Sequence, residues 1–152
     1  MIRLRFVTCH DAISAAIRFA EYGFWASHAE AVMPDGTLLG AHYDGGVQAR
    51  PAGYDQAIML RQQVAEIPCA EAMAQRFHGF LRAQLGKPYD VEAIGALVAR
   101  RDWREPDSWF CSELIAAALE TCGYLPPLAA DVSKIMPRDL LLIVSARIPL
   151  AA

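Results

Sequence analysis

The chain has 152 residues, of which 55% are hydrophobic and 20% charged, so we expect a single globular domain over residues 1–152 with a substantial core. A formal net charge of −3, with no basic stripe, argues against nucleic acid as a partner. The N-terminus lacks a secretory h-region and no apolar run reaches the roughly 18 residues of a membrane span, so we expect a cytoplasmic protein.

The first half of the chain predicts an antiparallel sheet interrupted by one helix. Apolar residues alternate weakly from the start, and Asp11 is a suitable N-cap for a helix that Gly23 ends. The turn Pro34–Gly36 joins two strand-like segments into a β-hairpin. The expected strands cover residues 2–8, 26–33, 37–43, 47–50 and 58–67, and the expected helix covers residues 11–22.

The second half predicts helices. Apolar residues recur at helical spacing after Cys69, and again in SWFCSELIAAALETCG, where Ser108 is a candidate N-cap and Gly123 a C-cap. A sheet followed by helices indicates an α+β arrangement. The expected helices cover residues 69–85, 91–98 and 108–123, followed by a turn and short helix within 131–141 and a closing strand over 142–148.

Two residues are candidates for nucleophilic catalysis. Cys111 lies in the first turn of an expected helix, where backbone N–H groups and the helix dipole stabilise a thiolate. His28 lies on an expected strand, which holds a base rigidly, and Glu30 shares its face. The alternative is structural for both, since most lone cysteines in apolar helices are buried and most isolated histidines are not catalytic.

The hairpin register predicts a second histidine beside the first. If Met33 pairs with Thr37 across the turn, His28 lies opposite His42, with the two Cβ atoms about 5 Å apart. A neighbouring strand could then orient the imidazole of the base. A register slip of one residue would put a different side chain there and remove this inference.

Four short motifs occur in the order typical of one enzyme family. They are S-H-A-E (Ser27–Glu30), G-K-P-Y-D (Gly86–Asp90), F-C-S-E-L (Phe110–Leu114) and P-R-D-L (Pro137–Leu140). With these motifs the chain resembles the circularly permuted NlpC-type cysteine peptidases, papain-like enzymes in which the histidine-bearing sheet precedes the cysteine-bearing helix. The resemblance implies a permuted papain-like α+β fold, with an antiparallel sheet packed against helices that include the nucleophile helix.

The resemblance also implies roles for individual residues. Cys111 matches the nucleophile, His28 the general base, and Tyr89 the tyrosine whose hydroxyl helps to shape the oxyanion site. Many relatives place a glutamate on the strand after the base strand, whereas this chain has His42 there. His42 is therefore the first candidate for the third polar residue, and Glu30 is the competitor.

The implied reaction is cleavage of an amide or peptide bond without a cofactor. The family suggests a small peptide-like substrate, derived from the cell wall or of γ-glutamyl type. Two other functions stay open: a lipid-directed acyltransferase or thioesterase, since permuted relatives include such activities, and a non-catalytic binding module with the same shell. The lack of an obvious membrane anchor counts against the lipid-directed activity.

The remaining cysteines and histidines are interpreted as structural. No C-x-x-C pair occurs, so reduced thiols are expected, and the spacing of cysteine and histidine matches no zinc motif, so no metal site is expected. This interpretation covers Cys9, Cys69, Cys122, His10 and His78.

Overall fold

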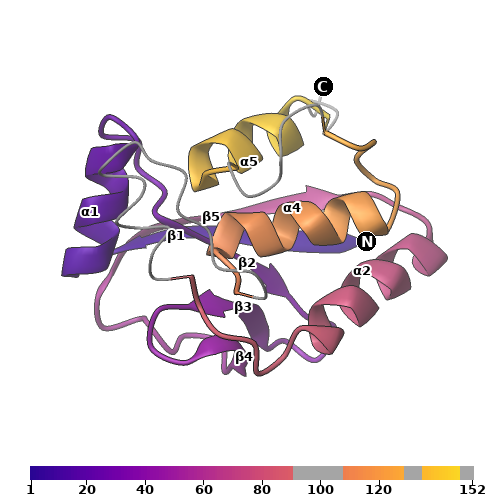
Figure 1. Ribbon diagram of the computed structural model, residues 1–152, viewed down its shortest axis with the longest axis horizontal. Helices are drawn as coiled ribbons and strands as arrows, with labels where there is room; N and C mark the ends of the chain where they lie inside the picture. The colour runs from indigo at the N-terminus through magenta and orange to yellow at the C-terminus, as the bar shows by residue number, and fades with distance from the viewer. Residues whose placement is uncertain (91–107, 129–134, 148–152) are drawn as a thin grey trace.

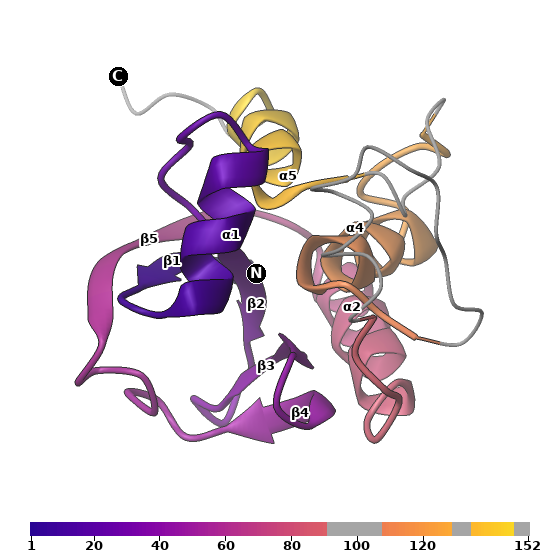
Figure 2. The same cartoon turned by 60° about the vertical axis from the view of Figure 1, so that its left-hand side comes forward.

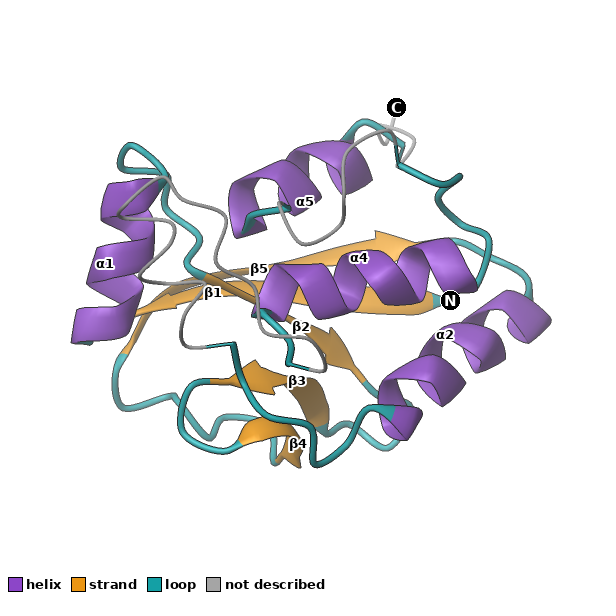
Figure 3. Cartoon of the chain, in the orientation of Figure 1, coloured by secondary structure: helices purple, strands orange, loops and turns teal. Residues whose placement is uncertain are grey.

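A computed structural model describes residues 1–90, 108–128 and 135–147. Within these ranges the chain combines one five-stranded antiparallel sheet with four helices (Figure 3). The expected α+β class is therefore confirmed. The elements in chain order are β1 (Ile2–Cys9), α1 (Ala12–Ala20), β2 (His28–Val32), β3 (Leu38–His42), β4 (Gly46–Arg50), β5 (Met59–Ile67), α2 (Glu71–Ala83), α4 (Cys111–Thr121) and α5 (Pro137–Ser145).

The sheet has the strand order β4-β3-β2-β1-β5, and every neighbouring pair is antiparallel. Because successive side chains of a strand point to opposite faces, the register divides the sheet into an apolar face and a polar face. On the polar face, Arg5 pairs with Glu30 and Val7 with His28 across β1 and β2. The apolar face carries fully buried residues: Ile2, Leu4, Phe6, Ala29 and Ala31.

Helices cover the apolar face. α4 lies across β2 and β3, α2 packs beside α4, and α5 contacts both α4 and β5 (Figure 1 and Figure 2). Leu114, Ile115 and Leu119 of α4 are fully buried in the same core cluster as the apolar face. Each such side chain contributes about 1.5–3 kcal/mol on burial, so α4 is held firmly and the position of its first residue is fixed.

The β2–β3 hairpin has the predicted register. Ala31 pairs with Leu39, and the Met33 N–H donates to the Thr37 carbonyl at 2.8 Å. Gly36 has a φ of 83°, the left-handed conformation that the turn requires and that glycine adopts without strain. The hairpin therefore places the end of β3 beside the start of β2, as the turn sequence predicts.

The closing strand expected over 142–148 is wrong. Residues Pro137–Ser145 form helix α5 instead, with proline in its first turn, where its missing N–H costs nothing. Leu140, Leu141 and Val144 are buried at helical spacing. The apolar pattern that suggested a strand comes from residues in the second half of this amphipathic helix. The short helix expected within 131–141 is the beginning of α5, and the helix expected over 91–98 lies outside the described residues.

Helix α4 begins later than the expected helix over 108–123. Phe110, and not Ser108, is the N-cap, and its N–H donates to the side chain of Glu113 at 3.2 Å. Gly123 follows the C-cap residue with a φ of 83°, as expected for the end of a helix. Cys111 is therefore the first residue of α4. Across the described ranges, no helix combines the length and apolarity needed to cross a membrane.

Candidate active site

Cys111 is held at the N-terminus of α4 by packing on all sides. It is fully buried, and its neighbours Phe110 and Leu114 belong to the same core cluster. The hydroxyl of Ser112 donates to the Ile135 carbonyl at 2.5 Å, which ties the first turn of α4 to the segment before α5. The first turn of a helix presents N–H groups and the positive end of the dipole, an environment that favours an anion.

Tyr89 reaches Cys111 because the segment before it pairs with the sheet edge. The Val47 N–H donates to the Lys87 carbonyl at 2.8 Å, and the Gly86 N–H donates to the Val47 carbonyl at 2.9 Å. This close approach requires glycine at position 46, because a Cβ there would lie 2.2 Å from the Lys87 carbonyl oxygen and φ is +74°. The G-K-P-Y-D motif is thus docked onto β4.

The same segment then pairs with the residues that precede α4. The Trp109 N–H donates to the Pro88 carbonyl and the Asp90 N–H to the Trp109 carbonyl, both at 3.1 Å, which forms an isolated parallel bridge between Tyr89 and Trp109. The rings of Tyr89 and Phe110 lie 5.8 Å apart. This bridge brings the tyrosine next to the first residue of α4.

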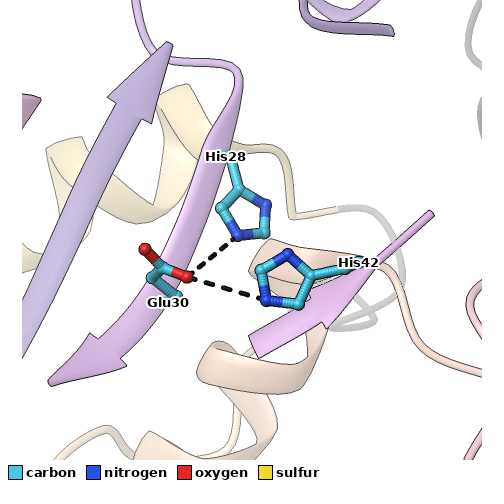
Figure 4. Close-up of side chains that lie close together, drawn as sticks. All are labelled: His28, Glu30 and His42. Atoms are coloured by element: carbon cyan, nitrogen blue, oxygen red, sulfur yellow. Dashed lines mark ion pairs between the residues drawn. The ribbon is translucent and has the colours of Figure 1, made fainter. Parts of the chain in front are cut away.

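The two strand histidines lie side by side, as the register predicts. The rings of His28 and His42 are 4.8 Å apart and tilted by 38°. Both rings direct Nε2 toward Oε2 of Glu30, at 3.5 Å from His28 and 3.7 Å from His42 (Figure 4). The other ring nitrogen of His28, Nδ1, points away from Glu30 (Figure 4). The contacts therefore favour Glu30 over His42 as the group that orients the His28 ring.

Glu30 is a fully buried carboxylate in a network of paired charges. Arg5 donates from Nη1 to Oε1 of Glu30 and from Nη2 to both carboxylate oxygens of Asp55, the latter at 2.9 Å. The hydroxyl of Tyr54 donates to Oε2 of Glu30 at 3.3 Å. A buried charge is tolerated only when it is paired and hydrogen-bonded, and this network meets that condition.

Arg5 remains cationic in this network. Burial lowers the pKa of its guanidinium, but hydrogen bonds and attraction to Asp55 and Glu30 outweigh burial and raise the pKa above its ordinary value. Tyr54 keeps its proton, because burial and the carboxylates of Glu30 and Asp55 raise the pKa of its hydroxyl. The cationic Arg5 thus binds Oε1 of Glu30, while Oε2 faces the two histidines.

The absence of a side chain at Gly40 leaves room for the side chains of Glu30 and His28. Gly40 lies on β3 opposite Glu30, and a Cβ at this position would lie 2.9 Å from the Glu30 Cβ and 3.5 Å from Nε2 of His28. The first distance is shorter than carbon atoms tolerate, so any larger residue would push Glu30 and His28 apart. The glycine in the Leu39–His42 stretch is therefore a requirement of the site.

The two histidines differ in charge. Burial lowers the pKa of His28, but a hydrogen bond and the charge of Cys111, together with Glu30, outweigh burial and raise the pKa to about 10. Burial lowers the pKa of His42 to about 2, and the nearby positive charges of His28, Arg50 and Arg5 act in the same direction. At neutral pH His28 is therefore an imidazolium beside Cys111, and His42 is a neutral ring.

Tyr89 is a hydrogen-bond donor near the sulfur. Burial raises the pKa of its hydroxyl well above the ordinary value, and electrostatic interaction with Cys111 and Asp90 raises it further. The phenol therefore keeps its proton.

A cavity of about 270 Å³ opens beside the histidines on the polar face. Cys111 is not among its lining residues and lies fully buried, near His28 and Tyr89, which do line it. A small group in this cavity would thus meet the imidazoles and the tyrosine first. Its lining includes His28, His42, Arg50, Tyr54, Asp55 and Tyr89.

The cysteines and histidines interpreted as structural differ in burial: Cys9, Cys122 and His78 are buried, Cys69 is half-buried and His10 is exposed. All four cysteines are free thiols. Burial raises the pKa of Cys9 to about 12, with the charges of Asp55 and Asp11 adding to the effect, and burial also raises the pKa of Cys122. His78 is buried on α2, away from the hairpin, and burial lowers its pKa.

Sequence reasoning missed the residues that support the site. Arg5 carried a signal, since a charged residue between the apolar residues of a central strand must find a partner on one face of the sheet. Tyr54 and Asp55 come from the loop between β4 and β5, which no motif marks. Gly40 looked like an ordinary strand glycine. Of all the described residues, His28, Glu30 and His42 alone form a group of three or more potential metal ligands.

Comparisons of this chain with models of known protein families and with curated proteins find no match.

Proposed function

We propose that this protein is a cysteine hydrolase that cleaves an amide or peptide bond through a Cys111 acyl-enzyme, with His28 as acid and base. One observation carries the proposal: Cys111, the first residue of α4, lies within hydrogen-bonding reach of the imidazole of His28, the first residue of β2. A thiol beside an imidazole at a helix N-terminus is the arrangement that activates catalytic cysteines.

The arrangement also supports the permuted papain-like fold as the finer assignment. The nucleophile helix α4 lies across β2 and β3, and the histidine-bearing strand precedes it in the chain. This order of sheet first and helix second is what the resemblance to NlpC-type peptidases implies.

The first half of the reaction forms the acyl-enzyme. The Cys111 thiolate attacks the carbonyl carbon of the substrate, a C–S bond forms, and the carbonyl electrons move to oxygen. The Tyr89 hydroxyl and N–H groups at the start of α4 donate to this oxyanion. When the tetrahedral intermediate collapses, the C–N bond breaks and the imidazolium of His28 gives its proton to the leaving amine.

The second half releases the acid. Neutral His28 takes a proton from a water molecule and becomes the imidazolium as the hydroxide attacks the thioester carbonyl. The C–S bond then breaks and the Cys111 thiolate leaves, which restores the thiolate and imidazolium pair. Because Nε2 of His28 faces Glu30, Nδ1 is the nitrogen left for the sulfur, the water and the leaving group. Glu30 is thus a positioning residue that orients the ring and stabilises its positive charge.

His42 has a different part in this scheme. Its ring lies against His28, and its pKa of about 2 keeps it uncharged. A neutral ring here excludes water from the contact between His28 and Glu30, and it adds no second positive charge. We therefore assign the third polar position to Glu30 and a packing role to His42.

The cavity supports a small peptide-like substrate. A volume of about 270 Å³ lies at the low end for a ligand pocket and suits one amino-acid residue or a short peptide. Arg50 at its wall pairs with Asp44, so the wall carries charge of both signs. A small peptide-like amide, such as a cell-wall stem peptide fragment or a γ-glutamyl amide, fits this setting.

The test is turnover of synthetic amides. Purified protein is assayed with dipeptide and γ-glutamyl anilides and, in parallel, with acyl thioesters; Cys111→Ser is expected to lower turnover by about 10⁴-fold or more, while Cys122→Ser changes it less than threefold. Thioester turnover without amide turnover would move the assignment to the acyltransferase or thioesterase alternative. Turnover of neither, with Cys111 inert, would favour a binding module.

A further inference from the structure

Two imidazole nitrogens and one carboxylate oxygen converge on one point between β2 and β3. Nε2 of His28 and Nε2 of His42 are both buried, and neither makes a well-formed hydrogen bond to another residue in the described part of the chain. Both face Oε2 of Glu30, at 3.5 and 3.7 Å, and the ligand atoms of the three residues all lie within 4.8 Å of one another (Figure 4). His42 is only 5% exposed, so bulk water does not satisfy its nitrogen.

The arrangement fits a small dication. Around a tetrahedral zinc ion with bonds of about 2.0–2.1 Å, neighbouring donor atoms lie about 3.3 Å apart. The two nitrogen–oxygen distances are within about half an ångström of that value. Two histidines and one glutamate are also a ligand set of catalytic zinc sites, and imidazole and carboxylate suit other first-row divalent metals.

The surrounding residues hold the three candidate ligands in place. The backbones of β2 and β3 hold all three residues, and Gly40 leaves the space between them. Arg5 binds Oε1 of Glu30, and Oε2, which accepts one hydrogen bond from the Tyr54 hydroxyl, has further lone-pair capacity toward the convergence point. The charge of Arg5 is offset by Asp55, which accepts from its Nη2 with both oxygens, so Glu30 keeps its negative charge for a cation.

We propose that Nε2 of His28, Nε2 of His42 and Oε2 of Glu30 form a binding site for a divalent transition-metal ion such as Zn²⁺, and that the ion inhibits the hydrolase. Metal binding itself does not depend on the proposed function, but the inhibition does. An ion on Nε2 replaces the proton there and keeps His28 from forming the imidazolium that protonates the leaving amine. The site is therefore a means of switching the hydrolase off.

Binding is tested directly on the full-length Cys111→Ser protein, which needs no activity. The protein is stripped with EDTA, dialysed, and titrated with ZnCl₂ at pH 8 by isothermal calorimetry. One ion per chain is expected, and adding His42→Gln or Glu30→Gln should weaken binding at least about tenfold. His10→Ala is the matched control, since His10 is exposed and lies outside the site.

Cobalt provides a second readout that separates this site from a metal bound to the thiol. Co²⁺ added to the protein with Cys111 intact should give a d–d spectrum without a thiolate-to-cobalt charge-transfer band. A strong charge-transfer band that Cys111→Ser abolishes would overturn the assignment of the ligands. So would unchanged zinc affinity in both the His42→Gln and Glu30→Gln variants, with thermal melts showing that they fold.

Inhibition by the metal ion is tested in a separate experiment. Zinc should lower turnover of the active protein with the affinity that calorimetry gives, and EDTA should restore it. Stoichiometric binding without loss of turnover would overturn the inhibitory role and leave the metal site standing. If the protein turns over none of the synthetic substrates, the calorimetric result still decides the metal site, so the two failures are distinguishable.

Discussion

Helix α4 carries a cysteine at each end, and the two have opposite chemical settings despite equal burial. Cys111 begins the helix and Cys122 is its C-cap; their exposures are 0% and 1%. The thiol of Cys122 donates to the Leu119 carbonyl at 3.3 Å, and burial raises its pKa. Cys111 has instead the positive end of the helix dipole and the imidazolium of His28. We therefore expect helix polarity and the neighbouring ring, and not burial, to decide which of the two thiols reacts.

The largest effect is expected from removal of the His28 ring, which distinguishes the Cys111 end of α4 from the Cys122 end. His28→Ala should lower turnover of the synthetic amides by about 10³-fold or more, because the thiol loses its base and the leaving amine loses its acid. His10→Ala should leave turnover within twofold. Steady-state kinetics of both variants, each checked by a thermal melt, make the comparison. Equal activity of the two variants would remove His28 from the reaction.

The charge of His28 predicts where activity is lost at high pH. Its pKa rises from 6.5 to about 10 in the folded protein, so the imidazolium is present below about pH 10 and is lost as the pH rises through that value. In EDTA-treated protein, kcat should hold through pH 8 and fall near pH 10. Glu30→Gln should move this alkaline limb to lower pH, because Glu30 is one of the groups that raise the pKa. A limb near pH 6.5 in the unmodified protein would contradict the pairing of Cys111 with His28.

Glu30 and His42 should differ in the kinetics. Glu30→Gln is expected to cost about 10–100-fold in kcat, since it removes the group that orients Nε2 of His28, and His42→Ala should cost less than tenfold. Glu30→Gln also removes one of the two carboxylates that pair with the buried Arg5, which lowers the free energy of unfolding, so rates are compared on folded protein. A larger loss of kcat for His42→Ala would restore the preference that the sequence suggested.

The smallest of these effects concerns two glycines in matched substitutions. Gly40→Ala should lower the free energy of unfolding by about 1–3 kcal/mol, because its Cβ would lie 2.9 Å from the Glu30 Cβ. Gly79→Ala, in the middle of α2 with nothing within 4 Å of the new Cβ, should raise it by about 0.5–1 kcal/mol. Chemical denaturation measures both. Equal effects of the two substitutions would show that the site tolerates a Cβ at position 40.

Local patterns were sufficient for much of the scaffold. Asp11 caps α1 as expected, and its side chain accepts from the Ser14 N–H. The turn Pro34–Gly36 fixed the hairpin register, because a tight turn leaves one way to pair the strands, and that register brought His28 and His42 together. The position of Cys111 at a helix N-terminus followed from the apolar run after it. These features depend on neighbours in sequence.

The hydrogen-bonded network around Glu30 could not be predicted from local sequence patterns. The contact of Arg5 with Glu30 and Asp55 joins two strands and a loop, and no local pattern encodes such a meeting. The preference for His42 over Glu30 did not allow for side-chain length: a glutamate two residues along a strand is long enough to bring its carboxylate within 3.7 Å of the Nε2 atoms of both rings. The expectation of no metal site relied on ligands close together in sequence, whereas His28 and His42 meet across the hairpin.

The most direct test of the account compares the two thiols of α4 within one protein. EDTA-treated protein is labelled with iodoacetamide at pH 6, and the rate at each cysteine is followed by peptide mass spectrometry. Cys111 should react at least about tenfold faster than Cys122, and His28→Ala should abolish most of that difference while His10→Ala leaves it intact. Equal rates at Cys111 and Cys122 in the unmodified protein would contradict the assignment of Cys111 as nucleophile.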